Sequence, residues 1–253
     1  MTDVREAARP DLRLDGRCVI LTGASQGIGV ALASALHLAG ARTVLAARHI
    51  ADVEVTDEAR QLAVACDVTV EGDRHKLVTT ALEWSGRVDV LINNAGFARS
   101  APALEETATD VKRTVDSNLL GPLRLCQLVG AGMVERGSGS IVNVASLIGL
   151  RSVDRYALAS YAASKAAVIA LTRELAAQWG RDGVRVNAVA PGWFPTRMTG
   201  FLEDAEQADW IVRHTSLGRT GRLEEMVGPV LFLAGEASSY VTGQVLAVDG
   251  GWL

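Results

Sequence analysis

Short apolar segments alternate with longer segments of helical periodicity along the chain. Most of the short segments are continuously apolar, which is typical of strands buried on both faces of a parallel sheet. The longer segments repeat their apolar positions at the spacing of a helix. The pattern predicts strands at 18–22, 43–47, 62–66, 88–93, 140–145, 184–189 and 245–248, and helices at 27–40, 71–85, 107–136, 155–180 and 223–234.

The repeated order of strand and helix predicts an α/β fold, a doubly wound parallel sheet of about seven strands with helices on both faces. No linker rich in proline, serine or glycine divides the 253 residues, and no internal repeat is present. We therefore expect one domain over 1–253. The alternation is interrupted only at 193–216, where the sequence predicts a small substrate lid.

Composition narrows the class of protein. The chain is 49% hydrophobic and 21% charged with a net charge of -4, which excludes disordered and collagen-like chains. Its arginines are scattered without a basic stripe, so nucleic acid is not an expected partner. The uncharged stretch 18–41 contains Thr22, Ser25, Gln26 and several glycines, which argues against a membrane span.

The cysteines and histidines point to no metal. Cys18, Cys66 and Cys126 lie in apolar surroundings without a CxxC spacing, as expected of a reduced, cytoplasmic protein. Residues 1–17 mix acidic and basic side chains and lack an apolar run, so we expect no secretory signal. None of the four histidines has the spacing of a metal ligand; they are His37, His49, His75 and His214.

A glycine-rich loop, TGASQGIG at 22–29, joins the first strand to the first helix. Gly23 allows a tight exit from the strand, Gly27 lets the backbone approach a pyrophosphate, and Gly29 lets the helix pack close to the sheet. Free N–H groups at the start of the helix attract the anion. The alternative is a turn that only joins the two elements. A dinucleotide phosphate site here would also include Ser25, Gln26 and Ile28.

The end of the second strand bears on the choice of cofactor. In such folds a carboxylate about 20 residues beyond the loop holds the ribose 2′-hydroxyl of NAD, whereas an arginine accommodates the 2′-phosphate of NADP. Here the strand ends in Arg48 and His49 without a carboxylate. NADP(H) is therefore favoured and NAD(H) remains possible. Arg48 can also be a solvated charge after a strand.

Candidate catalytic chemistry centres on Tyr161 and Lys165. These residues are four positions apart in an alanine-rich segment, so they share one helix face. A nearby ammonium group favours the phenolate, and we expect Lys165 to lower the pKa of Tyr161. Ser146 follows a predicted strand and can donate to a substrate oxygen. Asn118 lies inside a predicted helix, where propensity alone favours other residues.

Each of these residues also has a plain structural explanation. A Tyr–Lys pair can be a half-exposed helix face, Ser146 can cap the end of a strand, and Asn118 can bond a neighbouring carbonyl. Their order along the chain after the glycine loop makes the plain explanation unsatisfactory.

The sequence resembles the short-chain dehydrogenase/reductase family from about residue 14 to the end. The matching blocks are TGASQGIG (22–29), CDV (66–68), NNAG (93–96), DSNLLG (116–121), SIVNVAS (140–146), YAASK (161–165), RVNAVAPG (185–192) and YVTGQVLAVDGG (240–251).

The resemblance implies a Rossmann-type fold and a catalytic tetrad of Asn118, Ser146, Tyr161 and Lys165. Tyr161 would be the general acid in carbonyl reduction and the base in alcohol oxidation. Lys165 would hold the nicotinamide ribose, Ser146 would orient the substrate oxygen, and Asn118 would anchor a water. The implied activity is hydride transfer between a nicotinamide cofactor and a small ketone or secondary alcohol.

The resemblance also implies a cofactor site. Without it, NNAG could be a simple turn and Asp67 an ordinary turn aspartate. The implied contacts are Asp67 and Val68 with adenine, Asn94, Ala95 and Gly96 beside the adenosine ribose, and Pro191, Gly192, Phe194 and Thr196 with the carboxamide and pyrophosphate.

Two departures from related sequences concern the segments around the site. Ser146 and Tyr161 are 15 positions apart, about two more than is usual in 3-oxoacyl-carrier-protein reductases, so the loop 147–160 is expanded. Its charged residues Arg151, Asp154 and Arg155 can contact a polar or acidic substrate or face solvent. Only about 17 residues separate the second strand from Cys66, so we expect the helix between them to be reduced.

Three hypotheses follow. The first is an NADP-preferring oxidoreductase, the second a dinucleotide-sensing protein without catalysis, and the third an NAD-dependent alcohol or polyol dehydrogenase. The apolar residues Phe194, Met198, Phe201, Leu202 and Trp210 suggest an apolar substrate pocket, although packing alone also explains them. The segment 238–252 resembles the family's subunit contact, which implies a homotetramer or a dimer. A buried last strand without a partner is the alternative.

Overall fold

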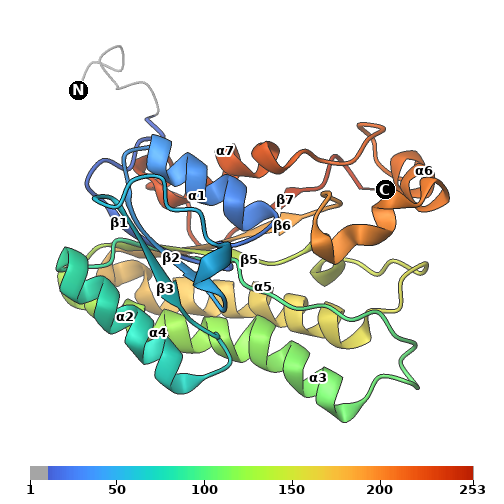
Figure 1. Cartoon of the computed structure of the whole chain (residues 1–253), viewed down its shortest axis with the longest axis horizontal. Coiled ribbons are helices and arrows are strands. Elements are labelled where there is room, and N and C mark those ends of the chain that lie inside the picture. Colours follow the sequence, from blue (N-terminus) through green and yellow to red (C-terminus); the bar gives the residue numbers. More distant parts are fainter. Residues whose placement is uncertain (1–10, 253) are drawn as a thin grey trace.

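Seven parallel strands form one sheet in the computed structural model, which describes residues 11–252 (Figure 1). The predicted doubly wound α/β fold is confirmed. The strands lie in the order β3-β2-β1-β4-β5-β6-β7, and every neighbouring pair is parallel. Their bounds are β1 Cys18–Thr22, β2 Arg42–Ala47, β3 Gln61–Ala65, β4 Val90–Asn93, β5 Gly139–Val144, β6 Val184–Pro191 and β7 Val245–Val248.

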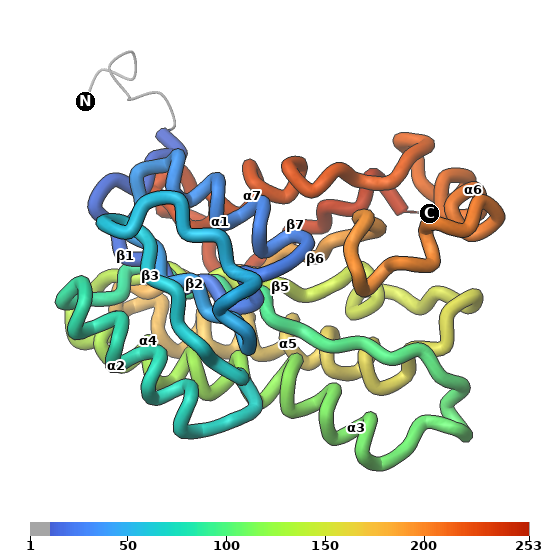
Figure 2. The backbone as a smooth tube through the Cα atoms, in the orientation of Figure 1, coloured from blue at the N-terminus to red at the C-terminus, as the bar shows by residue number. Residues whose placement is uncertain are grey.

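Helices cover both faces of this sheet. Helices α1 and α7 lie over one face, and α2, α4 and α5 lie over the other (Figures 1 and 2). The local sequence explains the bounds of helix α2. Acidic side chains occupy its first turn, where they favour the start of a helix, and Gly86 in the left-handed conformation ends it. The helices are α1 Ile28–Leu38, α2 Glu71–Ser85, α3 Ala108–Val115, α4 Gly121–Arg136, α5 Ala159–Trp179, α6 Ala205–Arg213 and α7 Val227–Ala234.

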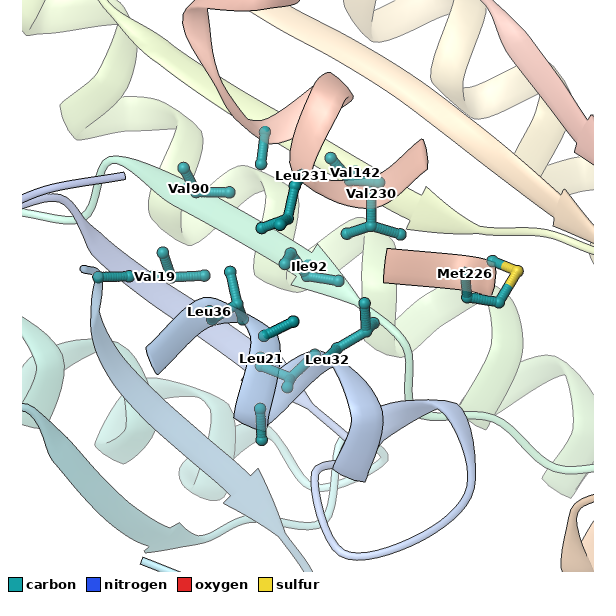
Figure 3. Packing of buried hydrophobic residues seen from close by; sticks show 14 of the residues in the cluster. Val19, Leu21, Leu32, Leu36, Val90, Ile92, Val142, Met226, Val230 and Leu231 are labelled. Atoms are coloured by element: carbon teal, nitrogen blue, oxygen red, sulfur yellow. The ribbon is translucent and has the colours of Figure 1, made fainter. Parts of the chain in front are cut away.

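The continuous apolar strands supply two separate layers of core. In β1, Val19 and Leu21 belong to the core under α1 and α7, whereas Ile20 belongs to the core under α2, α4 and α5. Figure 3 shows Val19 and Leu21 beside Leu32 and Leu36 of α1, with Leu231 of α7 in the same cluster. Successive strand residues point to opposite faces, so a strand covered on both sides must be apolar throughout.

Two predicted helices differ from the structure. Of the predicted helix 107–136, residues 108–136 are helical, but a π-helical turn at Asp116–Leu120 separates α3 from α4. The segment 155–180 becomes α-helical only at Ala159, because Tyr156 and Leu158 turn into an apolar cluster instead. Between β2 and β3 there is only a short 3-10 helix at Ile50–Asp52, as the short connection predicts.

The segment 193–216 forms a 3-10 helix at Arg197–Glu203 followed by α6. Both figures of the whole chain show α6 and the C-terminal end side by side, at one end of the sheet (Figures 1 and 2). Its action as a lid stays a prediction, as does the single-domain organisation of 1–253. The expectation about a secretory signal falls largely on residues 1–10, outside the described residues. No helix within 11–252 is long and apolar enough to cross a membrane.

The strand order creates a natural binding crevice. From β1 the chain proceeds outward to β2 and β3, then returns to β4 on the other side of β1. In open sheets of this kind, ligands bind outside the carboxyl ends of the strands where the winding direction reverses. The glycine-rich loop follows β1 at this point.

Candidate active site

A cavity of about 980 Å³ opens at the carboxyl ends of the strands. Its size lies in the range of pockets that bind small molecules and cofactors. Among the predicted site residues, Gly29 and Asn118 lie behind the wall of the cavity. The others line it: Gly23, Ser25, Gln26, Gly27, Ile28, Arg48, Asp67, Val68, Asn94, Ala95, Gly96, Ser146, Tyr161, Lys165, Pro191, Gly192, Phe194 and Thr196.

The glycine positions of the loop have little or no space for side chains. A Cβ atom on Gly29 would lie 1.9 Å from the carbonyl oxygen of Gly23, and one on Gly27 would lie 3.0 Å from Cγ2 of Thr196. Gly27 also has a φ of +53°, which side-chain-bearing residues rarely adopt. The loop therefore brings bare backbone to the cavity at the start of α1, which suits the close approach of a phosphate group.

The ends of β1 and β4 are tied together beneath this loop. The hydroxyl of Thr22 accepts hydrogen bonds from the backbone N–H groups of Asn94 and Ala95, each at 3.0 Å. The Asn94 amide in turn donates to the carbonyls of Thr22 and Gly23, also at 3.0 Å. Sequence reasoning did not include Thr22 among the site residues. Its position at the first residue of the glycine-rich block was the available signal.

Two basic side chains, Arg48 and Arg113, line the cavity together with Asp67. Arg48 follows β2 directly, and Asp67 follows β3 after Cys66. Burial raises the pKa of the Asp67 carboxyl, but hydrogen bonds from Thr69 and the charges of Arg48 and Arg113 outweigh it, so that pKa lies below its ordinary value. Arg113 of α3, which sequence reasoning missed, lies with its guanidinium carbon 4.0 Å from the ring centre of Phe97.

Tyr161 and Lys165 project from the first turns of α5 into the same cavity. The Lys165 ammonium lies 5.8 Å from the centre of the Tyr161 ring and donates to the carbonyl of Val144 at 2.7 Å. Burial lowers the pKa of Lys165 to about 8. Burial also raises the pKa of Tyr161, and a hydrogen bond with Ser146 only partly opposes it.

The pKa of Tyr161 is therefore raised, not lowered, in the protein alone, and a lowering by the Lys165 charge stays a prediction. The helix spacing does place both side chains at one cavity, as expected. However, the ammonium group is turned toward the Val144 carbonyl, and the loss of water around the phenol outweighs the other influences on it.

Ser146 follows β5 and both caps a helix and contacts the tyrosine. Its hydroxyl accepts the Ile148 N–H at 3.2 Å, which caps the 3-10 helix Leu147–Gly149. The proximity of the same hydroxyl acts to lower the pKa of Tyr161, by less than burial raises it. The capping explanation and a role next to the phenol are thus compatible.

Asn118 lies in the π-helical turn and is 1% exposed. Its amide donates to the carbonyl of Phe97 at 2.8 Å and to the hydroxyl of Ser164 at 3.0 Å, and its oxygen accepts the Phe97 N–H at 2.8 Å. A Cβ on Gly96 would lie 3.3 Å from this oxygen and 3.7 Å from the Lys165 ammonium. Asn118 thus joins the loop after β4 to α5. The sequence did not single out its partner Ser164 as a site residue.

The other end of the cavity is aromatic and apolar. The ring of Tyr156 lies 4.7 Å from that of Phe201 and 5.1 Å from that of Trp193, centre to centre. Of the expected lid residues, Phe194, Met198 and Phe201 line the cavity, whereas Leu202 and Trp210 pack behind it. Sequence reasoning missed the polar lining residue Gln207, which helical periodicity in α6 does not distinguish from its neighbours.

The geometry suits an extended cofactor with a reacting group beside Tyr161. The bare glycine loop provides backbone donors, the Arg48 end provides positive charge, and Gly96 leaves space beside Lys165. Within residues 11–252 no group of three or more His, Cys, Asp or Glu side chains is placed to hold a metal ion. The arrangement can move a proton at Tyr161 next to a bound small molecule.

Comparisons with known proteins agree with this geometry. Residues 23–253 match the family model described as enoyl-(acyl carrier protein) reductase. Gluconate 5-dehydrogenase of Gluconobacter oxydans is 40% identical over 96% of this chain and 98% of its own length. Galactitol 2-dehydrogenase (L-tagatose-forming) of Cereibacter sphaeroides is 39% identical over 96% of this chain and 98% of its own length.

A solved structure extends the likeness to the fold. The gluconate 5-dehydrogenase of Burkholderia cenocepacia, in complex with NADP and tartrate, superposes with a TM-score of 0.89 at 35% identity. The match covers 95% of this chain and 96% of the other. The chain belongs to the short-chain dehydrogenase/reductase family of oxidoreductases.

Proposed function

We propose that this protein is an NADP(H)-dependent oxidoreductase that interconverts a secondary alcohol and a ketone, with Tyr161 as its general acid and base. The observation that carries the proposal is the meeting of Tyr161, Ser146 and Lys165 at the cavity that the glycine loop also lines. Membership of the family and the names of the relatives support the reaction class.

The chain's own residues account for the proton in this reaction. In alcohol oxidation, Tyr161 takes the hydroxyl proton as the carbon–oxygen double bond forms, and in reduction it returns that proton. The Ser146 hydroxyl, which lines the same cavity as Tyr161, orients the substrate oxygen. Lys165 is protonated below about pH 8 and favours the phenolate by its charge. When bound, the nicotinamide supplies or accepts the hydride.

Tyr161→Phe tests the assignment of the proton. We expect NADP(H)-dependent absorbance changes at 340 nm with a panel of ketones and alcohols, and a loss of about 10²–10⁴-fold in kcat for the variant. Binding of NADPH should be nearly unchanged. Tyr240→Phe is the matched control because Tyr240 is fully exposed. The proposal would be refuted if Tyr161→Phe kept the kcat of the wild type, or if the wild type turned over no compound of the panel.

Arg48 is proposed to favour NADP by holding the 2′-phosphate. Its place directly after β2 and at the cavity wall supports this, and the Burkholderia cenocepacia enzyme is known as a complex with NADP. The second candidate, an NAD-dependent polyol dehydrogenase, is favoured by the likeness to galactitol 2-dehydrogenase. Dissociation constants of both cofactors, measured for wild type and Arg48→Ala, separate the two. An unchanged preference for NADP in the variant would remove Arg48 from the argument.

We also propose a cytoplasmic homotetramer, or failing that a dimer. Strand β7 is at the edge of the sheet, Leu246 within it is 39% exposed, and Tyr240 just before it is fully exposed. An exposed apolar edge fits a subunit contact better than a last strand buried within one chain. All three cysteines are buried and unpaired, as suits a reducing compartment. Light scattering after gel filtration measures the oligomeric state.

A further inference from the structure

The relatives leave one feature of the substrate open. Gluconate is an acid, whereas galactitol is a neutral polyol, and enzymes named for both resemble this chain to nearly the same extent. A cation beside the reacting end of the cavity would distinguish the two classes. A candidate for this cation lies in the expanded loop 147–160, and its role rests on the proposed function.

Arg155 is the arginine of this loop that reaches the cavity. Its Nε donates to the side-chain oxygen of Gln207 at 2.8 Å, and its Nη2 donates to the carboxylate of Glu206 at 2.7 Å. Its guanidinium carbon lies 5.4 Å from the ring centre of Trp210. Three contacts from α6 therefore hold the planar group in one orientation at the cavity wall.

The guanidinium has unused donors in this position. Among the described residues, its Nη1 has no hydrogen-bond partner, so both N–H groups on that nitrogen are available. The Glu206 side chain is 79% exposed, and a pair with so exposed a partner is weak and screened by salt. A ligand carboxylate can therefore compete for Arg155, because a guanidinium binds two carboxylate oxygens at once.

The surroundings of Arg155 place it at the substrate end. Tyr156 and Leu158, the next residues along the loop, pack in one cluster with Tyr161 and Trp193. The hydroxyl of Tyr156 donates to the same Gln207 oxygen at 3.1 Å. Arg155 therefore directly precedes a residue of the apolar cluster to which Tyr161 belongs.

The other charged residues near the cavity serve elsewhere. Arg151, in the same loop, donates to the carbonyl of Trp252 at 2.8 Å and does not line the cavity. Arg197 also lines the cavity, and its neighbour Thr196 lies against Gly27 of the glycine loop. The Asp204 carboxylate caps α6 by accepting the Gln207 N–H at 3.0 Å.

We propose that Arg155 binds a carboxylate of the substrate, so that the substrate class is a hydroxy acid and its keto acid rather than a neutral polyol. Gln207, which accepts from both Arg155 and Tyr156, is a positioning residue for the guanidinium. The acid's reacting carbon then faces Tyr161 while its carboxylate is held at the loop 147–160.

D-gluconate and D-glucitol test this, since they differ only in the carboxylate or alcohol at C1. With NADP we expect wild-type kcat/KM to be higher for the acid. Arg155→Met should lower that preference about 10- to 100-fold, mainly through KM, because it removes a charged hydrogen bond. Arg155→Lys should restore part of it, and Glu206→Gln should increase it by freeing the guanidinium. Arg151→Met is the control in the same loop and should leave the preference unchanged.

A binding measurement covers the case in which neither compound turns over. Tartrate and the neutral erythritol are titrated into the enzyme with NADP, and the fluorescence of tryptophans such as Trp210 is followed. We expect tighter binding of tartrate, and loss of the difference in Arg155→Met.

Equal affinity of the wild type for acid and neutral compounds would overturn the proposal, as would an equal loss for both in Arg155→Met. The proposed function would still stand if other alcohols or ketones turn over. Its failure is a different result, namely no absorbance change at 340 nm with any compound.

Discussion

Replacing Lys165 by methionine should stabilise the folded protein while abolishing its activity. Lys165 is 5% exposed, and burial lowers its pKa from 10.5 to about 8. At 1.36 kcal/mol per pKa unit, the buried charge destabilises the fold by about 3 kcal/mol at neutral pH. Loss of the hydrogen bond to the Val144 carbonyl offsets about 1 kcal/mol of the gain. The net stabilisation of about 2 kcal/mol corresponds to an increase of about 4–8 °C in Tm.

The pH dependence identifies the cause. Below about pH 8 Lys165 is protonated in both the folded and the unfolded protein, and the full penalty applies. Between about pH 8 and 10.5 the unfolded chain binds more protons than the folded protein at this residue, so wild-type stability gains with rising pH. The advantage of Lys165→Met should therefore be largest near neutral pH and should shrink as the pH approaches 10.5.

The assay is thermal and urea unfolding without cofactor, at neutral pH and at about pH 10, for the wild type and the variant. Lys76→Met is the control, because Lys76 is an exposed lysine on α2 and its loss should leave Tm nearly unchanged at both pH values. The reasoning is refuted if Lys165→Met is no more stable than the wild type near neutral pH, or if its advantage is the same at both pH values.

Two further predictions concern the glycine loop and the thiols. Gly29→Ala should weaken NADPH binding at least tenfold, because its Cβ would lie 1.9 Å from the Gly23 carbonyl and must displace the loop; fluorescence titration measures this. Gly72→Ala on α2 is the control, because its Cβ would meet nothing within 4 Å. Equal NADPH affinities of Gly29→Ala and the wild type would contradict the prediction. Burial raises the pKa of Cys66 and of Cys126 to about 12, so neither thiol should react with a disulfide reagent at neutral pH until the protein unfolds. Rapid labelling of either thiol in the folded protein would show that this thiol is accessible and not buried.

The sheet could be predicted from local pattern because each strand is covered on both faces. The strands β1 and β7 have the predicted bounds, and the other five differ by no more than two residues at an end. Strand β4 begins at Val90 instead of 88, although the backbone of Asp89 still donates to the Cys18 carbonyl at 2.9 Å and accepts the Ser140 N–H at 3.0 Å. The buried Asp89 carboxylate adds a hydrogen bond from the Cys18 N–H at 2.8 Å.

The predicted helix boundaries were wrong where distant segments compete with helix propensity. The π-helical turn around Asn118 accompanies hydrogen bonds to Phe97 and Ser164, which are far away in the sequence. The late start of α5 reflects the packing of Tyr156 against Trp193 and Phe201. Neither contact leaves a periodic mark in the local sequence, so pattern alone could not reveal it.

The sequence by itself determined the positions of the apolar strands, the glycine loop and the helical spacing of Tyr161 and Lys165. Each of these depends on residues that are close together in the chain. Only the tertiary structure decided what surrounds them. It turned the Lys165 ammonium toward Val144 and made burial the main influence on the Tyr161 pKa. It also brought Arg155 to the cavity against Gln207 while tying Arg151 to Trp252. The pKa of a side chain and its free donors depend on solvent exclusion and on partners from other elements, which exist only after the chain has folded.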